Sequence, residues 1–175
     1  MSAGMRADAT LVAVGLGSNL DDPVWQVTEG LRRLAELPDT ELCAASSLYR
    51  NPPMGPQDQP DYVNAAALLR TSMEPLPFLA ALQAIEAAHG RVRLRRWGPR
   101  TLDLDLLLWG EQVLNLPSLT VPHPGLHERN FVLYPLAEIG PDLWVPGHGR
   151  VSELARRFPA SGLVRIAPAG AGAQD

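Results

Sequence analysis

The chain has 175 residues, of which 46% are hydrophobic and 19% charged, and its formal net charge is −4. This length suits one domain with a proper core, and no run approaches the roughly 18 apolar residues of a membrane span. All 15 basic residues are arginine. This excludes a P-loop and a protein-kinase site, because both place a lysine on phosphate groups. The acidic balance also argues against a broad nucleic-acid surface.

The N-terminal part of the chain predicts a strand, a tight turn and a helix. Residues 1–9 lack the apolar stretch of a secretory signal and are interpreted as a disordered leader. An apolar run at 11–14 predicts a buried strand, which ends in Gly15-Leu16-Gly17. A dinucleotide-binding fingerprint is rejected because position 20 is leucine where a third glycine is required. Asp22 as N-cap and Pro23 then predict a helix of about fourteen residues.

A strand and a proline-rich loop follow. Residues 40–50 predict the strand, and the single cysteine, Cys43, is interpreted as a buried structural thiol. Residues 51–60 contain four prolines and cannot form a helix or a central strand. They fit either a plain linker or a rigid wall for a flat ligand.

The middle of the chain predicts one more strand and a helix. A strand over 62–71 would place Tyr62 and Asn64 on one face. The helix after it would place Gln83 and Glu86 on one side, one turn before a cluster of arginines.

That cluster is followed by paired carboxylates. Five arginines lie within 91–100, and a Gly98-Pro99 turn leads into a segment that contains Asp103 and Asp105. In a strand both carboxylates project from one face, while the leucines at 102–106 face a core. Two neighbouring carboxylates suit Mg²⁺, and arginine forks suit polyphosphate. The pattern predicts a nucleotide-phosphate site, with a solvated loop beside an ordinary strand as the plain alternative.

The last third of the chain predicts shorter elements. They are a turn at 110–111, a small strand at 113–114, an extended segment at 119–124 and helices at 131–139 and 151–158. Phe131 is expected to pack inward in the first of these helices. Strands and helices mix without regular alternation, which favours an α+β sandwich. We expect one domain over 10–158 and a flexible tail over 159–175.

Four motifs in order give the chain a resemblance to the 6-hydroxymethyl-7,8-dihydropterin pyrophosphokinases of folate biosynthesis. They are Gly17-Ser18-Asn19-Leu20, the stretch from Gly55 to Ala65, Arg96-Trp97-Gly98-Pro99-Arg100-Thr101-Leu102-Asp103-Leu104-Asp105, and Val121-Pro122-His123-Pro124 with the stretch from Arg129 to Leu136. The resemblance implies a ferredoxin-like α+β sandwich with helices on both sides of a mainly antiparallel sheet. It also implies transfer of pyrophosphate from ATP to the pterin hydroxymethyl group, with two Mg²⁺ ions and release of AMP.

The resemblance also implies residue roles. The metal ligands would be Asp103 and Asp105, and the arginines that stabilise the transition state would be Arg91 and Arg100. Residues implied to contact ATP are Gln83, Glu86, Arg93, Trp97, Arg100, Leu106, Thr120, His123 and Arg129. Residues implied to contact the pterin are Pro53, Met54, Tyr62, Asn64, Trp97 and Phe131. Asn51 stands where relatives often carry threonine, and Ser118 where some carry an arginine that contacts ATP.

On the residues alone, two other functions stay open. A metal-dependent nucleotide hydrolase would use water in place of the pterin, and a nucleotide- or RNA-binding module would use the arginines without chemistry. The acidic net charge and the paired aspartates argue against the second. A monomer in the cytoplasm, with neither nucleic acid nor membrane as partner, is expected.

Overall fold

An antiparallel sheet with helices on both faces forms the molecule. A computed structural model describes residues 8–52, 58–90, 101–159 and 162–167. Its elements in order are β1 (Thr10–Ser18), α1 (Pro23–Ala35), β2 (Thr40–Ala45), β3 (Leu48–Asn51), β4 (Tyr62–Thr71), α2 (Pro75–Ala88), β5 (Asp103–Trp109), β6 (Leu114–Leu116), β7 (Leu119–Val121), η1 (Leu126–Glu128), α3 (Asn130–Ile139), β8 (Trp144–Val145), β9 (Gly149–Arg150), α4 (Val151–Ala155) and β10 (Val164–Ala167).

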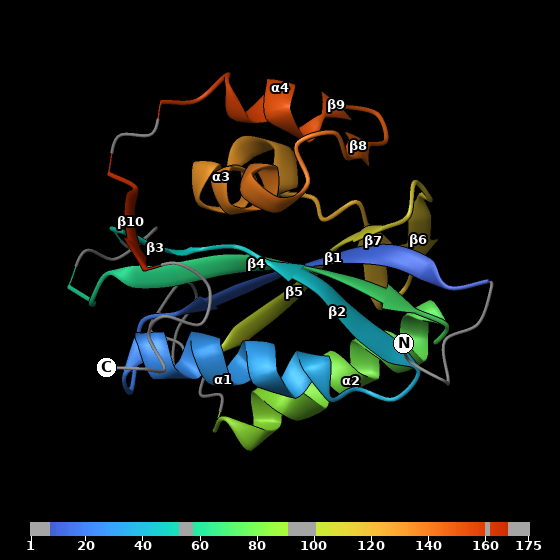
Figure 1. Cartoon of the computed structure of the whole chain (residues 1–175), viewed down its shortest axis with the longest axis horizontal. Coiled ribbons are helices and arrows are strands. Elements are labelled where there is room, and N and C mark those ends of the chain that lie inside the picture. Colours follow the sequence, from blue (N-terminus) through green and yellow to red (C-terminus); the bar gives the residue numbers. More distant parts are fainter. Residues whose placement is uncertain (1–7, 53–57, 91–100, 160–161, 168–175) are drawn as a thin grey trace.

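The main sheet has the order β10-β3-β4-β1-β5, with β2 also paired to β4, and all of these pairings are antiparallel. Helices α1 and α2 cover one face, and α3 and α4 cover the other (Figure 1). The predicted α+β sandwich is therefore confirmed. Within the described residues, no helix is long and apolar enough to cross a membrane.

Two apolar clusters lie on the two faces of the sheet. Leu102, Leu104 and Leu106 pack with residues of α1 and α2, as the alternation predicts. Leu107 packs on the opposite face with residues of α3 and α4. Because Asp103 and Asp105 alternate with the first three leucines, the face of β5 that carries them is the one covered by α3.

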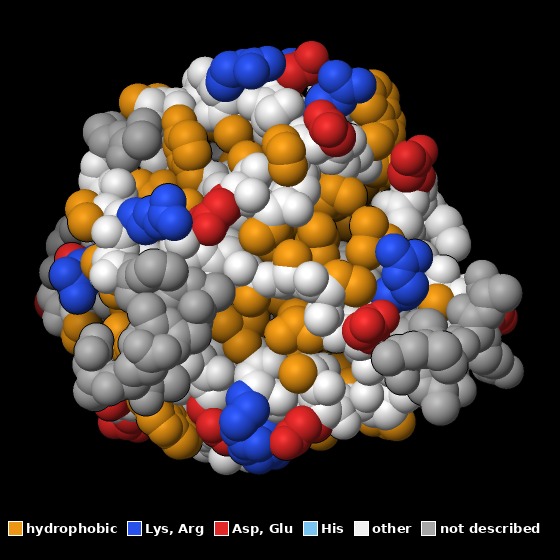
Figure 2. All heavy atoms as spheres, viewed as in Figure 1, with side chains coloured by type: hydrophobic (Ala, Val, Ile, Leu, Met, Phe, Trp, Pro, Cys, Tyr) orange, Lys and Arg blue, Asp and Glu red, His pale blue; other side chains and the backbone are white. Residues whose placement is uncertain are grey.

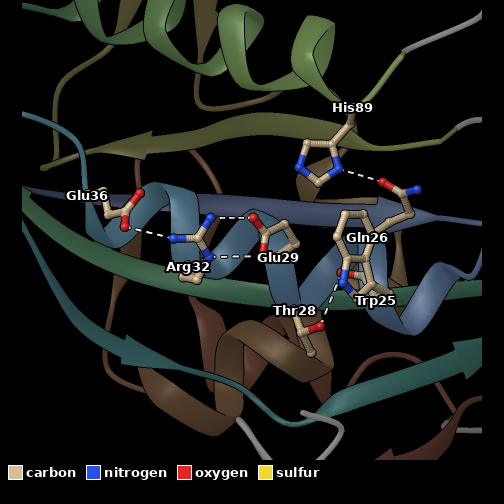
Figure 3. A network of polar contacts seen from close by, with 7 residues as sticks. All are labelled: Trp25, Gln26, Thr28, Glu29, Arg32, Glu36 and His89. Atoms are coloured by element: carbon tan, nitrogen blue, oxygen red, sulfur yellow. Dashed lines mark hydrogen bonds and ion pairs between the residues drawn. The ribbon is translucent and has the colours of Figure 1, made fainter.

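Helix α1 begins where the sequence predicts. Asp22 caps α1, where its side chain accepts a hydrogen bond from the Trp25 amide, and Pro23 is the first helical residue. The first turn of α1 is joined to the C-terminal end of α2 by a hydrogen bond of 2.5 Å between Gln26 Oε1 and His89 Nδ1, beside the Trp25 ring (Figure 3). Figure 3 also shows Arg32 bridging two glutamates along α1. The contacts of His89 with Gln26 and Trp25 hold the C-terminal end of α2, directly before the arginine cluster, against α1.

The surface view has a mixed charge pattern. On the face in Figure 2, acidic and basic side chains are interspersed around the rim, and apolar atoms lie between them. Among the side chains drawn in colour there, the cationic ones are scattered and do not form one basic patch.

Three features differ from the sequence predictions. The strand predicted over 40–50 is divided into β2 and β3. Cys43 is exposed, so its assignment as a buried thiol is wrong; the register of β2 against β4 shifts between Leu42 and Ala44, and this bulge turns Cys43 outward. Strand β10, which pairs with β3, lies within the stretch that the sequence assigns to the tail.

A carboxylate on α3 explains the break between β2 and β3. Both oxygens of Glu138 accept hydrogen bonds from the Ser47 amide at 3.1 Å, and the carboxylate also accepts from the Ser47 hydroxyl at 2.8 Å and the Tyr49 hydroxyl at 2.6 Å. Burial opposes ionisation of Glu138, but these hydrogen bonds and the Arg165 charge together lower its pKa. Burial, followed by the Glu138 contact, raises the pKa of Tyr49. The ionised carboxylate thus fastens α3 to the sheet.

Replacing Glu138 by glutamine is expected to lower the free energy of unfolding by about 1–3 kcal/mol near neutral pH, because glutamine keeps one acceptor oxygen but replaces the other oxygen and the negative charge with an NH₂ group that faces the donors of Ser47 and Tyr49. The Glu138 pKa is lower in the folded state, so this stabilisation is present above its ordinary value of 4.5 and is lost as the pH falls through the folded value. Urea unfolding from pH 7 to pH 3 measures it. Glu36→Gln, at an exposed ion pair on α1, is the control and should change stability by less than about 0.5 kcal/mol. A pH-independent difference for Glu138→Gln would contradict the assignment.

Candidate active site

Two glycines of β1 make the floor of a cavity between α3 and the sheet. Gly17 lies opposite Asp103 of β5 on one side and Asn64 of β4 on the other, and Gly15 lies opposite Asp105 and Ala66. All six of these residues line the cavity, and three of them, Asn64, Asp103 and Asp105, bring polar side chains to it. Because glycine leaves no side chain between the two flanking strands, the aspartates and Asn64 face one shared space.

Aromatic side chains form the walls of this cavity. Tyr62 from β4 and Phe131 from α3 line it, together with Asn51 from the end of β3. Phe131 is only half-buried and belongs to neither apolar cluster, so the prediction that it packs inward with the core is wrong. The guanidinium of Arg129 lies 5.9 Å from the centre of the Phe131 ring. The structure therefore brings together the three described residues predicted for the pterin: Tyr62, Asn64 and Phe131. Pro53, Met54 and Trp97 lie outside the described residues.

A second cavity adjoins the first along β5. Among the residues that line it are Gln83, Glu86, Asp105, Leu106, Thr120 and His123. Five of these are residues predicted to contact ATP, and the sixth, Asp105, lines both cavities. Arg129, also predicted for ATP, lines the first cavity. The remaining predicted residues, Arg91, Arg93, Trp97 and Arg100, lie outside the described residues.

His123 is held in one tautomer. The Gly125 amide donates a hydrogen bond of 3.1 Å to His123 Nδ1, so the neutral ring carries its proton on Nε2. Burial lowers the pKa of His123; the Asp105 charge raises it and the Arg129 charge lowers it further. A neutral imidazole with an Nε2–H donor can bind a phosphate oxygen.

Glu86 has a structural contact that the sequence does not reveal. Its side chain is buried and one carboxylate oxygen accepts a hydrogen bond of 2.8 Å from the Leu104 amide. Leu104 lies between the two aspartates on β5, which is an edge strand of the main sheet. Glu86 therefore holds the backbone from which both aspartates project.

The paired aspartates fit a magnesium site completed by substrate. Within the described ranges, no group of three or more His, Cys, Asp and Glu residues could enclose a metal. Mg²⁺ usually binds proteins through one or two carboxylates and takes its remaining ligands from substrate phosphates and water. Asp103 and Asp105, half-buried on one face, supply that number of carboxylates.

An aromatic, amide-lined cavity that contains an acidic pair, next to a polar cavity that shares one of the two carboxylates, is the arrangement expected of a metal-assisted group-transfer enzyme. Comparison with known proteins agrees. Residues 13–141 match the model of the family described as 7,8-dihydro-6-hydroxymethylpterin-pyrophosphokinase. The chain belongs to this family.

Relatives with curated names support the membership. The chain is 52% identical to 2-amino-4-hydroxy-6-hydroxymethyldihydropteridine pyrophosphokinase of Pseudomonas aeruginosa, covering 89% of this chain and 96% of that protein. It is 47% identical to the protein of the same name from Haemophilus influenzae, covering 89% and 97%. The predicted activity, transfer of pyrophosphate from ATP to hydroxymethyldihydropterin in folate biosynthesis, is confirmed at this level.

Solved structures agree on the fold. The wild-type HPPK-DHPS of Plasmodium falciparum with pteroate superposes with a TM-score of 0.68 at 12% identity, covering 86% of this chain and 42% of that one. A structure of HPPK-DHPS in complex with substrates gives a TM-score of 0.65 at 13% identity, covering 85% and 44%. The chain spans less than half the length of these two proteins.

Proposed function

We propose that the two cavities divide the substrates between them. The cavity lined by Tyr62, Asn64 and Phe131 takes the pterin, and the cavity lined by Gln83, Glu86, Leu106, Thr120 and His123 takes ATP. The observation that carries this proposal is Asp105, which lines both cavities. The reacting groups would meet where the two cavities share this carboxylate.

The chemistry of each cavity suits its substrate. A pterin is flat, with donors and acceptors along its edge, so aromatic walls and an amide side chain recognise it. Thr120 and the His123 Nε2–H are donors suited to the nucleotide. Arg129, which lines the first cavity, adds a positive charge. Pro53, Met54 and Trp97 would complete the pterin site, and Arg93, Trp97 and Arg100 the ATP site.

The reaction needs positioning and charge compensation, because no protein nucleophile takes part. The pterin hydroxymethyl oxygen forms a bond to the β-phosphorus of ATP, its proton passes to solvent, and the bond from that phosphorus to the AMP oxygen breaks. Asp103 and Asp105 would hold two Mg²⁺ ions, which when bound neutralise phosphate charge. Arg91 and Arg100 would stabilise the charge that develops on the transferred group.

The setting proposed for this activity is a cytoplasmic monomer with no nucleic-acid partner, in which the single domain predicted over 10–158 extends to β10, because β10 pairs with β3.

AMP release from Mg-ATP, measured with and without 6-hydroxymethyl-7,8-dihydropterin, tests the proposed function. Pterin-dependent AMP is the expected result. AMP formed equally without pterin would favour a nucleotide hydrolase, and no AMP under either condition would overturn the proposal.

A further inference from the structure

Two amide side chains and a backbone carbonyl form a chain of hydrogen bonds at the edge of the first cavity. Asn64 Nδ2 donates to Asn51 Oδ1, and Asn51 Nδ2 donates to the Pro52 carbonyl oxygen at 3.0 Å. Both asparagine side chains are buried, at 7% exposure each, and both line the cavity. They come from neighbouring strands, because Tyr49 and Asn64 are partners in the pairing of β3 with β4.

The Pro52 carbonyl determines the donor-to-acceptor direction of this series of hydrogen bonds. A carbonyl oxygen only accepts, so Asn51 must turn its NH₂ group toward Pro52 and its oxygen toward Asn64. Asn64 must then turn its own NH₂ group toward Asn51. Rotating either amide by 180° would set two acceptors or two donors against each other in a buried site, which is costly.

Gly17 lies at the Asn64 end of this series of hydrogen bonds. A Cβ atom placed on Gly17 would lie 2.8 Å from Asn64 Oδ1. The Asn64 oxygen therefore points toward the backbone of Gly17, which lies between Asn64 on β4 and Asp103 on β5. The amide presents its acceptor on that side, and its second N–H remains for a ligand.

We propose that Asn51 is a positioning residue that determines which heterocycle the enzyme accepts, by fixing the orientation of the Asn64 amide. This inference rests on the proposed function, which places the pterin in this cavity. A 2-amino-4-oxo ring has a ring N–H donor beside a carbonyl acceptor, which complements the fixed amide. A 2,4-diamino ring has the reverse order, a ring nitrogen acceptor beside an amino donor, and would need the amide rotated.

A matched pair of variants tests the proposal. In Asn51→Thr the hydroxyl can accept from Asn64 and donate to Pro52, whereas Asn51→Val has the same shape and neither ability. Binding of 6-hydroxymethylpterin and of 2,4-diamino-6-hydroxymethylpteridine is measured directly by calorimetry with a non-hydrolysable ATP analogue present. The valine variant should lose about tenfold or more of the wild-type preference for the 4-oxo ring, and threonine should restore it.

Other outcomes separate the possible failures. Equal preference in wild type and Asn51→Val would overturn the role of Asn51. A wild-type protein that binds the ATP analogue but no pterin would overturn the pterin assignment of the cavity instead. If the valine variant fails to fold, Gly17→Ala tests the same oxygen from the other side. It should also lower the preference for the 4-oxo ring, and an unchanged preference would overturn the proposal.

Discussion

Replacing Asp103 or Asp105 by alanine is expected to lower kcat about a thousandfold or more while the protein stays folded. Metal stabilisation of transition-state charge is worth several kcal/mol, and each 1.36 kcal/mol changes a rate tenfold. Both side chains project from the face of β5 opposite the packed leucines, so their removal leaves that apolar cluster intact. Removing one of two neighbouring carboxylates also relieves their mutual repulsion. AMP formation over a series of Mg²⁺ concentrations, with thermal melting alongside, measures both effects.

The matched control for this experiment is Asp142→Ala, which removes an exposed carboxylate in the loop after α3, outside both substrate cavities. It should leave kcat and the Mg²⁺ requirement unchanged. Wild-type turnover of Asp103→Ala or Asp105→Ala at saturating Mg²⁺ would remove the metal assignment. A melting temperature that falls with the activity would show instead that the carboxylates stabilise the fold.

The parts of the site that follow local sequence patterns could be predicted. Alternation alone places Asp103 and Asp105 on one face of β5, and likewise Tyr62 and Asn64 on one face of β4. The start of α1 follows from an N-cap and a proline that are adjacent in the sequence. In each of these cases the interacting residues lie within a few positions of one another, so the local sequence is enough to predict the structure.

Features that depend on distant partners could not be predicted. Ser46 and Ser47 interrupt the strand over 40–50 because Ser46 Oγ accepts from the Ala66 amide and Ser47 bonds Glu138, 91 residues away. Cys43 turns outward because of a bulge in the pairing with β4. No local pattern contains either partner.

Several residues of the site also could not be placed from local sequence. Phe131 has helical spacing with core residues, so the sequence predicts burial, yet α3 begins at the cavity and leaves its ring in the wall. Gly15 and Gly17 look like turn residues in the sequence, but they lie in the middle and end of β1, where they make room for the cavity. Asn51, which looks like one more polar residue beside prolines, reaches Asn64 only through strand pairing.

Replacing Glu86 by alanine is expected to raise the Mg²⁺ concentration needed for activity and to lower kcat by about 10- to 100-fold, as loss of a group that supports metal ligands typically does. The Leu104 amide would lose its acceptor in a buried site, at about 1–3 kcal/mol of stability, and the backbone between the two aspartates would be free to shift. Turnover against Mg²⁺ concentration, and urea unfolding with and without Mg-ATP, measure these effects.

Glutamine at position 86 separates the two roles open to this side chain. Its amide oxygen can still accept from Leu104, so Glu86→Gln should restore most of the Mg²⁺ response if Glu86 acts by holding β5. If Glu86 instead acts through its charge on bound ATP, glutamine should be as damaging as alanine, with the loss in the KM for ATP and not in the Mg²⁺ requirement. Glu74→Ala, at the exposed start of the same helix where the side chain makes no capping hydrogen bond, is the control and should match wild type. Because β5 is the edge strand that carries both aspartates, pairing with β1 holds it on one side only, and a buried acceptor on α2 holds the Leu104 amide between the two carboxylates.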